Sequence, residues 1–273
     1  MDPKINLSLI FLLCLIMTTG SVTAQKKKSG SVFYEQIRLL DFEERESLIS
    51  KELVSGNFPE FLLNWKEITT IQKDASGKAR NLSLFISPDY LSVGNEEDYF
   101  TIPVSPMTAQ KVTNRYNASL PTPKVTDIIY RHAELKLEPF NYIPRKNRNE
   151  TVDIFYDHSR VIQAQIKAAG FHPGTFVAGT KKDIVISYKL SDSTRTRHVS
   201  IYGWHKLNGK PIQSLYNGHN KTYVDYSHGA RLISNRVLID GREFNYRDIL
   251  KDKNLFKLLS NEKEPLEKTT YSH

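Results

Sequence analysis

The residue types that perform acid–base or metal chemistry gather in one stretch of the chain, residues 202–231. Three of the eight histidines lie there, at His205, His219 and His228, and Asp225 lies between the last two. Imidazole changes its charge near neutral pH, and a carboxylate can orient an imidazole or bind a metal beside it. These four residues are therefore the candidate catalytic residues.

One hypothesis for this stretch is a metal centre. Two or three imidazoles with one carboxylate and an open coordination position form the usual catalytic zinc set. The candidate ligands are His205, His219, Asp225 and His228, and the candidate cofactor is zinc. The spacing matches no zinc motif, because the chain has no His-Glu-X-X-His sequence and only one cysteine.

A second hypothesis is metal-free acid–base catalysis, with His228 or His205 as the base and Asp225 orienting it. Residues three apart on a regular strand face opposite sides of the sheet. Gly229 follows His228 directly, and a glycine there permits a bulge that brings the carboxylate and the imidazole together.

A third hypothesis is non-catalytic. Tyrosine and tryptophan side chains can stack on a sugar or a peptide while neighbouring polar groups orient it. The candidate substrate-binding residues are Trp204, Tyr216, Tyr223, Tyr226 and Lys182. Aromatic residues of strands also serve simply as core, so all these alternatives remain open at the level of sequence.

The elements that must position these residues form an α+β pattern. Helices are expected over residues 41–56, 106–116, 124–132 and 159–169, and strands over 66–72 and 81–86. Further strands are expected over 183–190, 197–204, 223–233, 236–239 and 243–246. The predicted architecture is a helical N-terminal half with a mainly antiparallel sheet in the C-terminal half.

The domain organisation predicted from the sequence is simple. Residues 1–24 read as a secretory signal peptide, with Lys4, an apolar run and small residues before Gln25. A flexible arm over 25–33, a single domain over 34–260 with a possible lobe boundary near 140–150, and a disordered tail over 261–273 follow. A secreted or periplasmic protein without a membrane span after cleavage is expected.

The formal charge of +8 indicates which partners fit. A basic exported protein is attracted to anionic envelope or extracellular polymers. Nucleic acid is not expected, because the chain has no zinc finger, glycine-rich RNA motif or arginine stripe.

Several short motifs resemble a family of exported bacterial proteins to which no activity is assigned. They are residues 201–205 (Ile-Tyr-Gly-Trp-His), 211–213, 225–229 (Asp-Tyr-Ser-His-Gly), 87–91 and 120–122. The resemblance implies export of a bacterial protein and singles out the same stretch, but it implies no mechanism. The function predicted is a hydrolase acting on peptidoglycan or an extracellular polysaccharide through a cleft of His, Asp and Tyr. The alternative is a non-enzymatic sugar- or peptide-binding protein of the cell envelope.

Overall fold

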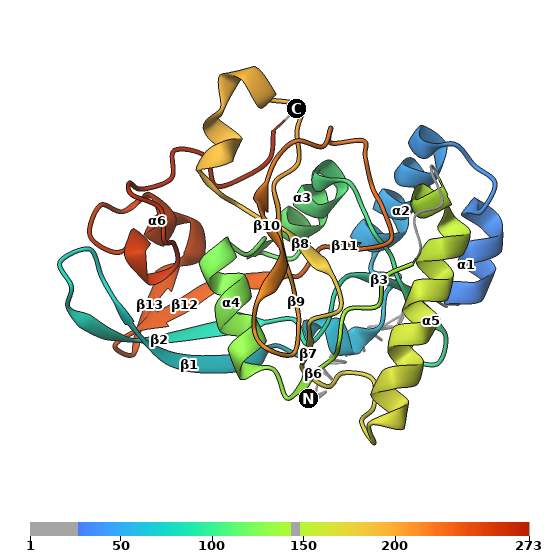
Figure 1. Cartoon of the computed structure of the whole chain (residues 1–273), viewed down its shortest axis with the longest axis horizontal. Coiled ribbons are helices and arrows are strands. Elements are labelled where there is room, and N and C mark those ends of the chain that lie inside the picture. The colour runs from blue at the N-terminus through green and yellow to red at the C-terminus, as the bar shows by residue number, and fades with distance from the viewer. Residues whose placement is uncertain (1–26, 143–147, 273) are drawn as a thin grey trace, which may run out of the picture.

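The structure is a computed structural model that describes residues 27–142 and 148–272. The predicted signal peptide lies outside these residues. Figure 1 shows helices distributed along the chain, around a central set of strands. Within the described ranges no helix combines the length and apolar character needed to cross a membrane.

Most of the described helices begin where the sequence supplies a capping side chain. Asp41 accepts the amide of Glu44 at the start of α2, and the helix ends at Gly56, whose φ of 91° only glycine adopts easily. Ser105 and Thr122 cap the next two long helices, each of which opens on a proline. The helices are α1 (Gly30–Ile37), α2 (Phe42–Ser55), α3 (Pro106–Arg115), α4 (Pro123–His132), α5 (Val152–Ala168) and α6 (Tyr246–Lys251).

The larger sheet joins strands from both halves of the chain. Its order is β1-β2-β12-β13, and β5 also pairs with β12. All these pairings are antiparallel. The strands are β1 (Lys66–Lys73), β2 (Ala79–Ile86), β5 (Ala118–Ser119), β12 (Ile233–Ile239) and β13 (Arg242–Asn245).

The smaller sheet carries the stretch singled out by the sequence. Its order is β10-β9-β8-β11, and β11 runs parallel to β8. Helix α4 packs against β9 and is drawn to the left of it in Figure 1. The strands are β8 (Lys182–Ile184), β9 (Ile201–His205), β10 (Pro211–Tyr216) and β11 (His228–Gly229). Two further strand pairs are β3 (Ser92–Gly94) with β4 (Tyr99–Thr101) and β6 (Leu135–Lys136) with β7 (Val177–Ala178).

The structure corrects the predicted division into a helical half and a sheet half. The protein is α+β, but its helices are spread across the chain and its first strand begins at residue 66. Strand β2 lies inside the sheet because β12, from the far end of the chain, pairs with it, whereas β1 forms an edge. Sequence periodicity reports local structure only, so it cannot show that distant segments share one sheet.

Individual elements also differ from the prediction. Helix α5 begins seven residues earlier than expected, at Val152. The expected strand over 223–233 is mostly loop, with a two-residue strand at His228 and Gly229. Strand β8 ends at Ile184, whereas residues to 190 were expected to extend it.

The chain ends are packed against the domain. Helix α1 begins at Gly30, inside the predicted flexible arm. Residues 261–273 were expected to be disordered, yet Leu266 is buried. The Tyr271 hydroxyl accepts the amide of Ser200 at 3.0 Å and donates to the carbonyl of Val185 at 2.8 Å. The apolar side chains of this polar segment are enough to fix it on the strands that carry the site.

Candidate functional site

Strand β8 divides the candidate residues into two groups. Successive side chains of a strand point to opposite sides of its sheet, so Lys182 and Asp183 face apart. Lys182 lies over the Trp204 ring, with its Nζ 5.3 Å from the ring centroid. Asp183 lies on the other side, near His205 and helix α4: a Cβ added at Gly203 would lie 3.5 Å from Asp183 Oδ2 and 3.5 Å from His205 Cε1, beside a side chain of α4.

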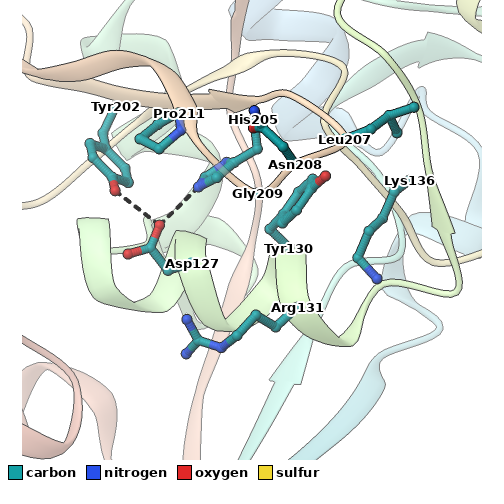
Figure 2. Close-up of a pocket in the computed structure, with 10 residues that line it drawn as sticks. All are labelled: Asp127, Tyr130, Arg131, Lys136, Tyr202, His205, Leu207, Asn208, Gly209 and Pro211. Carbon is teal, nitrogen blue, oxygen red and sulfur yellow. Dashed lines mark hydrogen bonds and ion pairs between the residues drawn. The ribbon is translucent and has the colours of Figure 1, made fainter.

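Helix α4 and strand β9 build the first group. Asp127 Oδ1 accepts hydrogen bonds from Tyr202 Oη at 2.9 Å and from His205 Nε2 at 2.9 Å. Residues three apart on a regular strand would face opposite sides. The two intervening residues have φ angles of 105° (Gly203) and 57° (Trp204), and this irregularity brings both side chains to one carboxylate. Figure 2 shows the two bonds converging on it.

The backbone of Trp204 is also unusual, because its φ angle is positive. Positive φ angles are rare outside glycine, and strained residues cluster at functional sites. A side chain at Gly203 would place its Cβ 3.1 Å from Thr126 Cγ2, so glycine is required there for both space and backbone angle.

The carboxylate, hydroxyl and imidazole line a cavity of about 490 Å³, which we call the Asp127 cavity. His205 is 3% exposed and stacks on Tyr130, with ring centroids 4.6 Å apart. Figure 2 shows Lys136 beside the Tyr130 ring, while the Arg131 side chain extends away from that ring below the helix. The lining residues are Asp127, Tyr130, Arg131, Lys136, Tyr202, His205, Leu207, Asn208, Gly209 and Pro211.

A second carboxyl group is buried behind the cavity. Asp183 Oδ2 accepts a hydrogen bond from Tyr90 Oη at 3.0 Å, whereas its buried Oδ1 has no partner among the described residues. Burial raises the pKa of Asp183 to about 6, although Arg231, Tyr90 and His205 oppose the shift. A carboxyl group in this range can hold a proton near neutral pH.

The second group, which we call the His228 cluster, comprises Lys182, His219, Tyr223, Asp225 and His228. His219 stacks on Tyr223, with ring centroids 4.2 Å apart, and its ring lies 6.2 Å from that of His228. Tyr223 Oη donates to Asp225 Oδ2 at 3.3 Å. His228 Nε2 lies 4.0 Å from Asp225 Oδ1, beyond hydrogen-bonding distance, and has no partner among the described residues.

Burial makes both histidines of the cluster poor proton acceptors. It lowers the pKa of His228 to about 4 and also lowers the pKa of His219, with Asp225 opposing both shifts. Burial opposes ionisation of Asp225 as well, but His228, Lys182 and hydrogen bonds from Ser227 outweigh it and hold that pKa at about 2. Ser227 donates to Asp225 Oδ1 from its amide at 2.8 Å and from its hydroxyl at 2.5 Å.

The structure therefore separates the predicted catalytic residues. His219, Asp225 and His228 lie together, while His205 belongs to the Asp127 cavity. Asp225 and His228 approach each other because residues 217–227 form a loop rather than a strand, with the amide of His228 donating to the carbonyl of Asp225 at 3.1 Å.

The predicted substrate-binding residues lie around the cluster, with different exposures. Tyr216 is 42% exposed and meets His219 edge to face, at 5.1 Å between centroids. Trp204 and Tyr226 are buried and pack together at 6.2 Å. Lys182 is half-buried beside them.

A fully buried lysine lies next to the cluster. Lys181 Nζ donates to the carbonyl of Tyr226 at 2.5 Å and lies 2.9 Å from His158 Nδ1. Because His158 Nε2 lies 3.2 Å from the carbonyl of Phe140, Nε2 is the donor of that ring and Nδ1 the acceptor. Burial lowers the pKa of Lys181 to about 7 and that of His158 to about 2. This pair fixes the loop that carries Tyr226.

The zinc hypothesis finds no ligand set in the described part of the chain. Among those residues, no group of three or more His, Cys, Asp or Glu side chains is arranged to hold a metal ion. The candidate ligands divide between the two sites, so His205 cannot share a metal with His219 and His228 in this arrangement.

Sequence reasoning missed the residues that α4 contributes. Asp127 and Tyr130 belong to a helix read only for its apolar spacing, and Asp183 was expected inside a longer strand. One signal was available: Asp127 and Tyr130 are three apart on a helix, so they share a face. The local sequence does not show which strand that face of the helix packs against.

Comparison with protein-family models, with curated proteins and with solved structures gave no match.

Proposed function

We propose that this chain is an exported hydrolase that acts by acid–base catalysis in the Asp127 cavity, on an anionic polymer such as peptidoglycan or an acidic polysaccharide. The observation that carries the proposal is the 2.9 Å bond between His205 Nε2 and Asp127 Oδ1 at the wall of a 490 Å³ cavity. An imidazole oriented by a carboxylate is the usual arrangement of a general base.

The hydrogen bonds assign a role to each group. A carboxylate only accepts, so Nε2 of His205 carries the proton and Nδ1 carries the lone pair. In the proposed reaction Nδ1 takes a proton from water as the water attacks, and the imidazolium then returns a proton to the leaving group. Asp127 orients the ring and stabilises the imidazolium, and the Tyr202 hydroxyl fixes the carboxylate.

The cations beside the cavity support an anionic substrate. Lys136 Nζ donates to the carbonyl of Ala133 at 3.2 Å and lies 5.7 Å from the Tyr130 ring centroid. Arg131 is exposed at the rim and forms no ion pair within 4.0 Å among the described residues. Guanidinium and ammonium groups in such positions recognise carboxylates or phosphates.

Export is part of the proposal. It rests on the signal-peptide pattern of residues 1–24 and on the resemblance of the short motifs to those of exported bacterial proteins. The formal charge of +8 suits an anionic polymer outside the cytoplasm.

The test is hydrolysis by the purified chain, residues 25–273. We would incubate it with peptidoglycan sacculi, pectate and hyaluronan, and measure new reducing ends and new amino groups separately. Reducing ends identify a glycosidase, and amino groups identify a peptidase or amidase. We expect His205→Gln to abolish release, with a loss of about 10²–10⁴-fold, while the matched His219→Gln variant retains it.

A second candidate function is binding of the same polymer without hydrolysis. The half-buried ring of Tyr202 at the wall of the cavity favours it, because an aromatic side chain beside charged groups can support a sugar ring. Cosedimentation with sacculi without any product would support binding; product formation lost in His205→Gln would exclude it.

A further inference from the structure

Three polar groups around the His228 cluster lack acceptors or partners. The indole Nε1 of Trp204 and the Nε2 of His228 are buried, and neither has a hydrogen-bond partner among the described residues. The Lys182 ammonium lies 5.3 Å from the centroid of the Trp204 ring, and within the described ranges it forms no ion pair closer than 4.0 Å. His228 is paired with Lys182 in the β8–β11 ladder, so the three side chains come from adjoining positions.

Unpartnered donors of this kind are costly. A buried donor without an acceptor destabilises a fold, and native proteins rarely keep one without a reason. Trp204 adds a positive φ of 57° to this cost. Strain and an orphan donor at one residue point to a ligand rather than to packing alone.

The nearest carboxylate does not supply the missing acceptor. Asp225 Oδ1 already accepts two hydrogen bonds from Ser227, and Oδ2 accepts one from Tyr223. The charge of Lys182 lowers the pKa of Asp225, but among the described residues no ion pair within 4.0 Å joins the two side chains. An acceptor for the ammonium and the indole must therefore come from outside these residues.

An accessible aromatic surface adjoins these donors. Tyr216 is 42% exposed, and it meets His219, which stacks on Tyr223. His219 is half-buried, so the rim of the cluster can be reached from solvent while its donors lie deeper.

We propose that the His228 cluster is a second binding site, for an oxyanion group carried by a ligand whose remaining surface lies on Tyr216 and His219. In the proposed complex Lys182 and the Trp204 indole donate to the oxyanion, and His228, in the tautomer that carries its proton on Nε2, supplies a third donor. This site lies on the other side of strand β8 from the Asp127 cavity, so it does not depend on the proposed hydrolysis. A carboxylate of an acidic sugar and a phosphate share this chemistry.

The test uses the two indole N–H signals in the ¹⁵N–¹H spectrum of residues 25–273, one from Trp65 and one from Trp204. A Trp65→Phe variant assigns them. Sodium D-glucuronate, inorganic phosphate and neutral D-glucose are titrated separately to about 10 mM, where millimolar binding is visible. We expect the Trp204 signal to shift saturably with at least one anion and not with glucose. Glucuronate alone would identify a carboxylated ligand, and phosphate alone a phosphorylated one.

Variants decide whether the shift reports this site. Lys182→Met, at a half-buried side chain without a hydrogen bond to lose, should weaken binding at least tenfold and leave the Trp65 signal in place. Asp127→Asn should leave binding unchanged, which separates this site from the cavity. A Trp204 signal that neither anion moves, or a shift that persists in Lys182→Met, would overturn the proposal.

Discussion

The two sides of strand β8 hold similar residue types in different states. In the Asp127 cavity, a carboxylate with 29% side-chain exposure accepts a hydrogen bond from a histidine beside open volume. In the His228 cluster, the carboxylate side chain is 9% exposed, its oxygens are taken by Ser227 and Tyr223, and the histidine is 4.0 Å away. Under the proposed function, the first pair exchanges protons with a substrate. The second holds its charges fixed and leaves donors free, which suits binding.

The comparison teaches that a count of histidines is a poor guide to the reactive one. Three histidines in residues 202–231 directed attention to their shared neighbourhood. Burial lowers the pKa of His228 and leaves its Nε2 without a partner among the described residues, while the equally buried His205 gains a carboxylate partner from a helix more than 70 residues earlier in the chain.

The largest expected effect separates the two carboxylates. Asp127→Asn should reduce kcat by about 10²-fold or more, because the amide cannot stabilise the imidazolium, and should change the free energy of unfolding little. Asp225→Asn should leave kcat nearly unchanged. It should lower the free energy of unfolding by about 2–3 kcal/mol, because buried hydrogen bonds to a charged group are lost. Polymer hydrolysis and urea unfolding measure the two effects. If Asp225→Asn abolished activity without a loss of stability, the roles of the two sites would have to be exchanged.

The sequence predicts those parts of the fold that depend on local contacts, and it does not predict those that depend on contacts between distant segments. The helix expected over residues 41–56 agrees with α2, because Asp41 and Gly56 act within that helix. The hairpin of β12 and β13 follows from Asp240 and Gly241, both with positive φ. The pairing of β12 with β2 was not readable, because no local pattern links strands about 150 residues apart.

For the site, the sequence located the stretch but not its partners. His219, Asp225 and His228 were placed together by their proximity in the chain. Asp127 was missed because the two positive φ angles at Gly203 and Trp204, which direct His205 toward α4, depend on tertiary packing.

The next effect concerns pH and tests the burial of His228. Its pKa is lowered from 6.5 to about 4 by burial, so the unfolded chain binds more protons than the folded one between these values. Stability contributed by the neutral imidazole is therefore present above pH 6.5 and is lost as the pH falls toward 4, by about 3 kcal/mol. His228→Gln should flatten this part of the curve of unfolding free energy against pH.

A matched variant controls this measurement. His172 is exposed, so His172→Gln should leave the slope unchanged. Protonation of Asp183 changes the free energy of unfolding in the opposite direction, because its raised pKa stabilises the folded state as the pH falls from about 6. This contribution is the same in both variants and does not affect their comparison. An unaltered slope in His228→Gln would show that this imidazole is accessible to protons.

Two glycines distinguish steric from conformational requirements. A Cβ at Gly229 would lie 2.5 Å from Tyr90 Cδ1 and 2.9 Å from Lys181 Cβ, so Gly229→Ala should cost about 2–3 kcal/mol by overpacking. Gly203→Ala should cost less, about 1–2 kcal/mol, but should reduce hydrolysis, because φ at 105° is what aligns His205. Gly77→Ala, with no atom within 4 Å and φ at 85°, measures strain alone. Equal loss of activity in Gly203→Ala and Gly229→Ala would mean that the two sites are not independent.

The smallest effect concerns the tyrosine that each carboxylate binds. Tyr202→Phe removes a 2.9 Å hydrogen bond to Asp127, and water can replace it because that carboxylate is partly exposed, so a loss of about 1 kcal/mol is expected. Tyr223→Phe removes a longer bond of 3.3 Å to Asp225, whose Oδ1 is still held by Ser227, and about 0.5 kcal/mol is expected. Only the first variant should reduce kcat, by a few-fold, since only Asp127 orients a base. Urea unfolding and initial rates at saturating polymer measure both quantities. A lower kcat in Tyr223→Phe with an unchanged rate in Tyr202→Phe would place the reacting atoms on the His228 side of β8, because a hydroxyl that only fixes a carboxylate affects the rate where that carboxylate acts.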